Sequence, residues 1–490
     1  MSGGFRHLFR HSVVYGLGGV AQRFIGFLLI PLYTRYLTPA DYGVLALAGL
    51  LGTVFQQLQL LGIPSAMTRS YILKSEKKEE REEVVATGAW SVLVQALVMM
   101  ILLFLLARPM ARMIFGSVEE VRFVYLIAGM APFYAVQSLR NTLFRIKEES
   151  KKYTAITVAT FLVNLTLTLF LVVGAGLGAF GVLLGQAGAS VFMALVFAPW
   201  MAGVLAVRSR FKSVCLADMM GYGLPLVPAG LASWALDLMD RYLLRLYRPL
   251  EEVGLYSLGY RFGTILVLLV MAFRLAWPQV MFAHARRGER EAKPFFARAL
   301  TYYAVVVGFV ALGIAVIGGD LLRLMTPEAF HPAAGVIPLI VLAYGVHGSF
   351  IILEVGIDVH KRTALIPLFT GLAAMVNLGL NLLLIPSFGM YGAAWATLVS
   401  FMIVPAAYEA VNRRIYPVRF QWTRIAMIVL MALVLFLLAH SLDTGHPLAD
   451  LMLKGAILLG YPLALWMAPI LSMEDRRRVS GWVRLALGRA

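Results

Sequence analysis

The chain has 490 residues, of which 60% are apolar and only 14% are charged, whereas an ordinary soluble domain carries about 25% charged residues. A soluble fold of this composition would lack the polar side chains to cover its surface, so lipid is the expected solvent. The formal net charge is +17, but no basic segment is long enough to form a nucleic-acid-binding domain, so nucleic acid is excluded as a partner.

Apolar stretches recur along the whole chain, and they predict an all-α integral membrane protein with about 14 transmembrane helices of about 20 residues each. The first stretch follows a basic N-terminal segment and is too long to be the core of a cleaved signal peptide. The predicted spans are 11–34, 42–64, 84–106, 120–144, 153–174, 178–203, 218–246, 253–282, 296–318, 333–358, 363–385, 389–411, 423–441 and 450–470.

The connections between these spans differ in charge. When the N-terminus is placed inside, Lys and Arg concentrate in every second connection, on the cytoplasmic side. This is the distribution that the positive-inside rule requires. The sequence therefore predicts a multi-pass protein of the bacterial inner membrane with both termini in the cytoplasm.

An internal repeat relates the two halves of the chain. Residues 34–49 (TRYLTPADYGVLALAG) resemble residues 244–259 (LRLYRPLEEVGLYSLG), and the later motifs GAFG at Gly178 and GMYG at Gly389 follow the same spacing. A constant spacing over separate motifs indicates duplication, and an even number of intervening helices keeps both copies in the same orientation. We therefore expect two pseudo-symmetric six-helix lobes plus two extra helices: 1–212 as the N-lobe, 213–415 as the C-lobe, 416–472 as helices 13 and 14, and 473–490 as an interfacial amphipathic tail.

No enzymatic motif is present. The sequence has no HExxH metalloprotease motif and no phosphate-binding loop, and Cys215 is its single cysteine. We therefore expect no catalytic residue, no metal site and no enzymatic activity, and the only cofactor we consider is a coupling ion, H⁺ or Na⁺.

Arginines within the predicted spans are the candidate substrate-binding residues. Arg23 lies too far from either end of its span to reach the headgroups easily, and a charge in that position requires a polar or wet surrounding. Arg241, Arg261 and Arg274 also lie within spans. Guanidinium groups match phosphate oxygens and stay protonated, so this set predicts an anionic substrate that carries phosphate. Arg140, by contrast, is expected to reach the membrane surface.

Two pairs of carboxylates accompany these arginines. Asp237 and Asp240 precede Arg241 in span seven, and Asp237 stands four residues before it, a spacing that allows an ion pair on one helix face. Glu354 and Asp358 share the same spacing near the inner end of span ten. Each pair is a candidate for binding a coupling cation or for a structural ion pair.

Two of these segments carry a family resemblance. Residues 23–47 (RFIGFLLIPLYTRYLTPADYGVLAL) and 240–262 (DRYLLRLYRPLEEVGLYSLGYRF) resemble the polysaccharide transporters. These form the Wzx-like branch of the multidrug/oligosaccharidyl-lipid/polysaccharide exporter superfamily. The resemblance implies a flippase that moves undecaprenyl-pyrophosphate-linked oligosaccharide from the cytoplasmic to the periplasmic leaflet by alternating access, for O-antigen, capsule or exopolysaccharide assembly. It also implies that Arg23 contacts the pyrophosphate, whereas Arg261 and Arg274 fit that role by position only.

The implied partners are the lipid-linked oligosaccharide, membrane lipids, a polysaccharide polymerase and glycosyltransferases. Three alternatives remain open: a cation-coupled multidrug exporter of the same superfamily, a lipid II flippase, and a non-transporting scaffold for glycosyltransferases.

Overall fold

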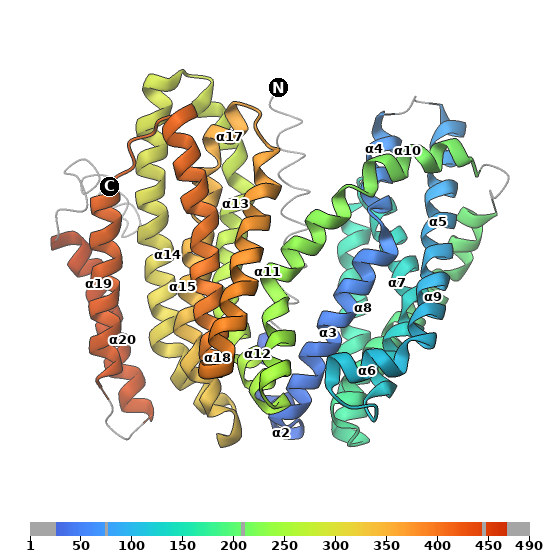
Figure 1. Ribbon diagram of the computed structural model, residues 1–490, viewed down its shortest axis with the longest axis horizontal. Helices are drawn as coiled ribbons and strands as arrows, with labels where there is room; N and C mark the ends of the chain where they lie inside the picture. The colour runs from blue at the N-terminus through green and yellow to red at the C-terminus, as the bar shows by residue number, and fades with distance from the viewer. Residues whose placement is uncertain (1–25, 74–76, 207–210, 443–446, 468–490) are drawn as a thin grey trace. The chain divides into compact units, whose positions relative to one another are not determined.

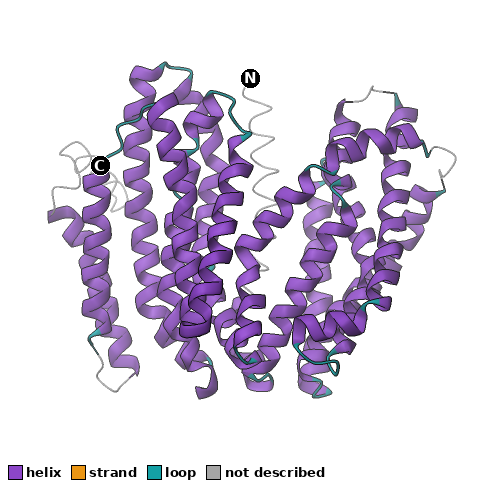
Figure 2. Cartoon of the chain, in the orientation of Figure 1, coloured by secondary structure: helices purple, strands orange, loops and turns teal. Residues whose placement is uncertain are grey.

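The computed structural model describes residues 26–73, 77–206, 211–442 and 447–467. Across these ranges the chain forms helices joined by short loops, and no strand occurs in them (Figure 2). The predicted all-α class is therefore confirmed. Arg23, most of the predicted first span and the predicted tail 473–490 lie outside the described residues.

The described residues form two compact units, which we describe separately. Unit 1 comprises the described residues of Met1–Ser257 together with Ala374–Ala393, and unit 2 comprises those of Leu258–Ala373 and Ala394–Ala490. The boundaries predicted for the lobes stay predictions. The first segment of unit 1, up to Ser257, contains α2 (Ile30–Tyr36), α3 (Pro39–Leu60), α4 (Ile63–Leu73), α5 (Lys78–Leu105), α6 (Ala107–Phe115), α7 (Val121–Ile146), α8 (Ser150–Leu169) with the π-helical turn η1 (Phe170–Gly174), α9 (Gly178–Leu205), α10 (Ser213–Gly223), α11 (Leu226–Tyr247) and the first part of α12 (Leu250–Gly263).

The remaining helices follow in chain order (Figure 1). They are α13 (Ile265–Ala285), α14 (Glu289–Met325), the 3₁₀-helix η3 (Glu328–Val336), α15 (Ile337–His347), α16 (Phe350–Leu353), α17 (Val355–Val359), α18 (Leu365–Ile415), α19 (Trp422–His440) and α20 (Pro447–Met467).

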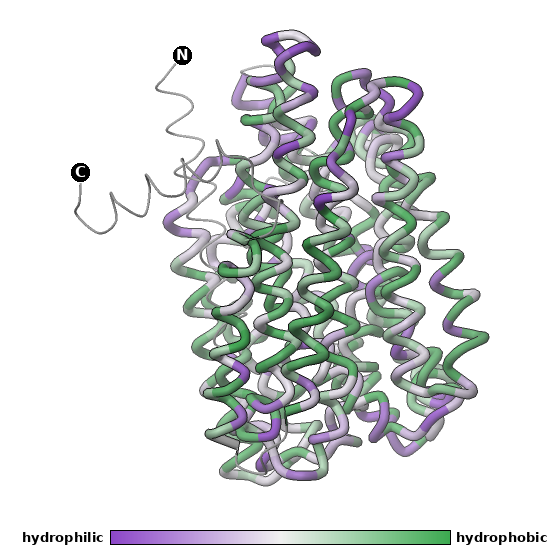
Figure 3. Tube along the Cα trace, turned by 90° about the vertical axis from the view of Figure 1, so that its left-hand side faces the viewer, coloured by the Kyte–Doolittle hydropathy of each residue, from purple (hydrophilic) through white to green (hydrophobic). Residues whose placement is uncertain are grey.

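Within the described ranges, 11 helices are long and apolar enough to cross a membrane. Apolar residues run along most of their length (Figure 3). One of them, α18, contains two of the predicted spans and departs from helical geometry between them, at Gly389 with φ 55° and ψ −131°. A further predicted span coincides with α7, which is not among the 11. The structure thus confirms a multi-pass membrane fold, and the total of about 14 spans stays a prediction.

The repeat that was read from the sequence reappears as a pair of equivalent hydrogen bonds. In the first copy, the main-chain N–H of Ala179 at the start of α9 donates to Asp41 Oδ1 at 3.4 Å. In the second copy, the N–H of Met390 donates to Glu252 Oε1 at 2.7 Å. Each bond joins residues 138 positions apart, and in each the preceding glycine, Gly178 or Gly389, has a positive φ of 51° or 55°. The duplication therefore extends to how a carboxylate from one helix stabilises the start of a later helix.

Local sequence explains why these carboxylates are so placed. Thr38 and Asp41 form a capping box at the start of α3, with Pro39 in the first turn, an arrangement that fixes where the helix begins. The N-terminal turns of α3 and α12 then cross at two glycines, where a Cβ on Gly43 would collide with Leu250 O and one on Gly254 with Pro39 O. Only glycine permits this backbone approach.

Helices α19 and α20 pack on α14 within unit 2. Lys454 Nζ of α20 donates to Asp320 Oδ2 of α14 at 2.6 Å, and both side chains are only 12% exposed. Further along, Tyr461 Oη donates to the Val305 carbonyl at 3.1 Å. Helix α20 is thus attached to α14 by a largely buried ion pair, and apolar contacts pack α19 and α20 together on α14.

Candidate functional site

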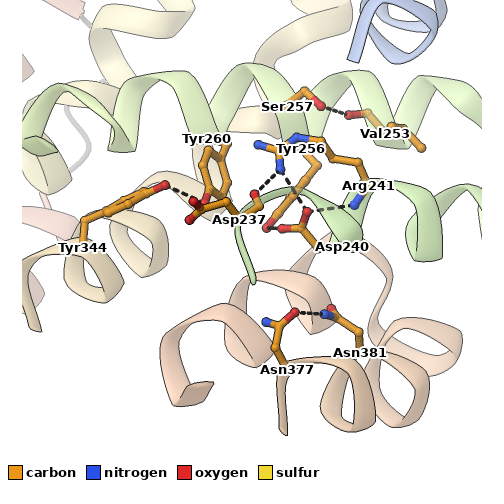
Figure 4. A network of polar contacts seen from close by, with 10 residues as sticks. All are labelled: Asp237, Asp240, Arg241, Val253, Tyr256, Ser257, Tyr260, Tyr344, Asn377 and Asn381. Atoms are coloured by element: carbon orange, nitrogen blue, oxygen red, sulfur yellow. Dashed lines mark hydrogen bonds and ion pairs between the residues drawn. The ribbon is translucent and has the colours of Figure 1, made fainter. Parts of the chain in front are cut away.

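Unit 1 contains a buried ion pair between adjacent residues of α11. Asp240 and Arg241 are 1% and 6% exposed, and Arg241 Nη1 lies 2.9 Å from Asp240 Oδ1. The same oxygen accepts the Arg241 main-chain N–H at 2.8 Å, and the Tyr256 hydroxyl of α12 donates to the other carboxylate oxygen (Figure 4). The carboxylate thus has partners on both oxygens, as a buried charge requires.

Arg241 also contacts Asp237, the residue that the helical spacing predicted as its partner, but not through the Asp237 carboxylate. Its Nη1 donates at 2.7 Å to the main-chain oxygen of Asp237, not to the carboxylate (Figure 4). The Arg241 guanidinium also lies over the Tyr256 ring, 5.7 Å from its centroid, while the Asp237 side chain is exposed. The structure therefore brings Arg241 together with Asp240 and leaves the Asp237 carboxylate free of an ion pair with any other described residue.

Two buried amides belong to the same unit. Asn377 and Asn381 lie one turn apart on α18 and are 1% and 0% exposed. Asn381 Nδ2 donates to Asn377 Oδ1 at 2.9 Å (Figure 4), and Asn381 Oδ1 is buried without a hydrogen-bond partner among the described residues. A buried amide that is incompletely bonded is unusual in a fully packed core.

Unit 2 gathers the other charged residues of the predicted site. Arg274 of α13 has an exposed side chain whose guanidinium lies 5.5 Å from the Phe350 ring centroid. Glu354 interacts electrostatically with Asp358 and Arg274, and Tyr408 of α18 interacts with all three of these charged groups. Within the described ranges no direct ion pair of Arg274 occurs, so its charge is only partly compensated.

The helix geometry explains how two carboxylates come to lie beside Arg274. The helical run breaks at Glu354, which ends α16 and precedes α17. Glu354 and Asp358 are therefore one turn apart on a short segment, and both are half-buried. At the end of α15, the ring of His347 lies tilted against Phe401 with 4.4 Å between centroids, and its Nδ1 has no hydrogen-bond partner among the described residues.

Two further predicted arginines have different surroundings. Arg261 on α12 is exposed, and its carbonyl oxygen accepts a hydrogen bond from Thr264 Oγ1 at 2.8 Å. Arg23 lies outside the described residues, so its role stays a prediction. The structure thus pairs Asp240 with Arg241 in unit 1 and brings Arg274, Glu354 and Asp358 together in unit 2, whereas Arg261 belongs to neither cluster.

The sequence analysis did not identify all the residues of the two charged clusters. Tyr256 and Tyr408 complete the two clusters through tertiary contacts, and a lone tyrosine in an apolar helix gives no local signal. Arg140 was expected to reach the membrane surface, but it is 2% exposed. Its guanidinium bonds Asn141 Oδ1 at 3.2 Å and lies 4.9 Å from the Phe197 ring centroid, because an adjacent amide and an aromatic face substitute for water.

The fold and these residues define a class of protein: an all-helical, multi-pass membrane protein with charged side chains inside its spans. The family model described as polysaccharide biosynthesis protein matches residues 8–277, more than half of the chain. The chain therefore belongs to this family, and the resemblance seen in the sequence is confirmed.

Two curated relatives from Haloferax volcanii are similar over part of the chain. The probable low-salt glycan biosynthesis flippase Agl15 is 20% identical over 229 residues, which cover 46% of this chain and 48% of the relative. The probable flippase AglR is 26% identical over 263 residues, which cover 51% and 53%. The chain thus matches about half the length of these relatives.

Solved structures share the fold. The lipid II flippase MurJ in an inward closed conformation superposes with a TM-score of 0.73 at 12% identity, over 93% of this chain and 99% of that one. An inward-facing multidrug resistance MATE family transporter of the MOP superfamily gives a TM-score of 0.67 at 15% identity, over 84% and 95%. At these identities the likeness concerns the fold alone.

Proposed function

We propose that the protein is a flippase for lipid-linked oligosaccharide. In detail, it would move undecaprenyl-pyrophosphate-linked oligosaccharide from the cytoplasmic to the periplasmic leaflet by alternating access, for O-antigen, capsule or exopolysaccharide assembly. Membership of the polysaccharide biosynthesis family supports this proposal, and so do the relatives described as flippases. The observation that carries it is Arg274, an exposed guanidinium within an apolar helix whose charge no direct ion pair among the described residues neutralises.

The arginines would serve this substrate in different ways. A guanidinium presents parallel N–H donors that match the oxygens of a pyrophosphate, and it does not lose its proton. We assign this contact to Arg274, to Arg261 and to Arg23. Arg241 is already paired with Asp240, so we propose that it contributes to the anion site only through the position of α11.

Glu354 and Asp358 would couple transport to an ion. Both carboxylates act electrostatically on the surroundings of Arg274. Binding of H⁺ or Na⁺ would remove negative charge there and strengthen the field of the guanidinium for an anionic headgroup. Loss of the ion would have the opposite effect and favour release of the headgroup, so the ion and the headgroup would be bound and released together.

The test is complementation of a deletion strain. The deletion should lose surface polysaccharide and accumulate the lipid-linked precursor in the cytoplasmic leaflet, and the wild-type gene should restore both. Arg274→Ala should fail to restore them, and Arg274→Lys should restore them only in part, because Lys lacks the planar fork. Arg323→Ala is the matched control, since Arg323 is 60% exposed at the end of α14. Normal surface glycan in the deletion strain would refute the proposal.

A cation-coupled multidrug exporter is the second candidate, favoured by the acidic pair Glu354 and Asp358 and by the shared fold of the MATE transporter. Raised sensitivity of the deletion strain to cationic dyes, with normal glycan, would support it. Accumulation of lipid II in place of the oligosaccharide precursor would instead indicate a lipid II flippase. A polymerase or glycosyltransferase partner would appear as co-purification with the wild-type protein.

A further inference from the structure

A groove runs along the side of unit 1 between α4, α5, α7, α8 and α9. It consists of two cavities of about 580 Å³ and about 550 Å³, which share Lys147, Pro199 and Trp200. Cavities of this size hold small organic ligands in other proteins. None of the residues that line the groove belongs to the charged clusters described above, so the groove is a separate feature of the fold.

One end of the groove is basic. Lys78 lies 3.9 Å from Glu82, and Lys152 lies 3.0 Å from Glu149, so these four charges compensate one another. Arg81 and Lys147 remain, and neither forms an ion pair with another residue of the described ranges. The groove therefore has two positive charges available for an anion.

Arg81 is held in place for such a contact. Its guanidinium lies 5.1 Å from the Tyr71 ring centroid, which orients the planar group. Its Nε is buried and has no hydrogen-bond partner among the described residues. A buried N–H of a charged group without an acceptor is costly, and an anionic oxygen in the groove would supply that acceptor.

The other end of the groove is apolar and aromatic. Trp200 stacks on Phe144 with 6.0 Å between ring centroids and meets Phe197 edge-on at 6.3 Å. Val196, which lines the groove, is 54% exposed, and its neighbour Leu195 is 66% exposed. Exposed apolar residues on a helix long enough to span a membrane indicate a surface that faces lipid chains, so the groove opens toward the bilayer.

We propose that this groove binds an anionic glycerophospholipid of the surrounding leaflet. The phosphate lies between Arg81 and Lys147, and one acyl chain follows Trp200 and Val196 toward the membrane interior. This occupant matches both ends of the groove, because a soluble anion would leave the apolar end uncovered and a neutral lipid would leave the two cations without a partner. The connections at this end, which hold Lys77 and Lys151, are among those predicted to be cytoplasmic, so the lipid belongs to that leaflet.

The test uses quenching of Trp200 fluorescence in vesicles. Phosphatidylglycerol with brominated acyl chains should quench the wild-type protein more strongly than brominated phosphatidylcholine at equal density. The Trp200→Phe variant should lose that difference, because the other tryptophans respond to both lipids alike. High salt should reduce the preference for the anionic lipid. Equal quenching by the two lipids would overturn the proposal.

Charge variants supply the matched control. A direct hydrogen bond from a charged donor to the phosphate contributes roughly a tenfold factor in affinity, so Arg81→Ala/Lys147→Ala should weaken phosphatidylglycerol binding by roughly 100-fold. Arg145→Ala/Lys151→Ala removes the same charges from exposed positions outside the groove and should change the affinity by less than about threefold.

The two double variants distinguish a groove site from general surface charge, and competition with undecaprenyl phosphate distinguishes the possible sources of the phosphate. Equal losses in both would show that the effect is general surface charge and would overturn the proposal. Undecaprenyl phosphate that displaces phosphatidylglycerol below equal concentration would assign the groove to the lipid carrier and would likewise overturn it. Retention of phosphatidylglycerol under that competition supports a structural phospholipid site, whatever the outcome of the transport assay.

Discussion

The buried pair on α11 makes a strong prediction about stability. Asp240→Asn keeps the shape of the side chain but leaves the Arg241 guanidinium, 6% exposed, without its counter-charge. Breaking one partner of a buried pair costs about 3–5 kcal/mol. At roughly 2 °C per kcal/mol for a chain of this size, the apparent melting temperature of the purified protein should fall by roughly 6–10 °C. Arg241→Met should cost a comparable amount, because it leaves the Asp240 carboxylate uncompensated.

A double variant tests whether Asp240 and Arg241 stabilise the fold as a pair. Asp240→Asn/Arg241→Met removes both charges, so its melting temperature should lie above that of either single variant, since the desolvation of both charges is lost together with their attraction. Melting is followed in detergent micelles at a fixed heating rate, because membrane proteins often unfold irreversibly. Additive losses in the double variant would refute the ion-pair account. An Asp240→Asn variant that is as stable as the wild type would also refute the ion-pair account.

Three other predictions concern packing and helix ends. Gly254→Ala should lower the free energy of unfolding by about 1–3 kcal/mol, because the new Cβ meets the Pro39 carbonyl oxygen. Gly52 has open space around it, so Gly52→Ala should leave that free energy unchanged or raise it by up to about 1 kcal/mol. Thermal melting distinguishes the two variants. Glu252→Ala should cost about 0.5–2 kcal/mol through the lost bond from Met390 N, whereas Glu252→Gln, which can still accept it, should cost less in the same assay. Lys454→Ala should speed proteolysis of α20 by removing the ion pair that joins α20 to α14, which leaves Asp320 only its longer, 3.8 Å contact with Arg323 of its own helix. An unchanged cleavage rate would contradict that role.

Hydropathy predicted most of the helices because a bilayer sets their length, and each helix satisfies its own backbone hydrogen bonds. The same reasoning could not predict that α18 runs from Leu365 to Ile415 as one assigned helix with a break in dihedral angles at Gly389. The length of an apolar stretch indicates how many residues lie in the lipid. It does not record where a glycine with positive φ turns the backbone.

The sequence identified most of the charged residues of the two clusters, but it did not identify which residues form ion pairs with each other. Helical spacing pointed to Asp237 as the partner of Arg241, yet the guanidinium pairs with Asp240. The reason is tertiary, since the Tyr256 hydroxyl holds the second oxygen of Asp240 from the next helix. Arg140 shows the same limit, because the aromatic face of Phe197 that covers it comes from α9. Local pattern identifies a charge in lipid, and only the fold identifies what compensates it.

The two copies of the repeat share a structural hydrogen bond but differ in their charged residues. The carboxylate bonds from Asp41 and Glu252 to the starts of later helices are equivalent in the two copies, 138 residues apart in each. The charges are not equivalent. At the repeat spacing of 211 residues given by Gly178 and Gly389, the positions that match Arg274 and Glu354 are Ile63 and Leu143.

Both of these aliphatic side chains are buried in the hydrophobic core of unit 1, at 0% and 1% exposure. Where the first copy packs apolar side chains, the second copy therefore has an exposed guanidinium and a carboxylate that interacts with it. A duplicated scaffold needs both copies of its helix-starting bonds, but it needs a polar cluster only where a charged cargo or ion must be received. This asymmetry is the reason to expect that Arg274→Ala will alter transport while leaving the fold intact, and that a charge introduced as Ile63→Arg will disrupt the fold without adding a site.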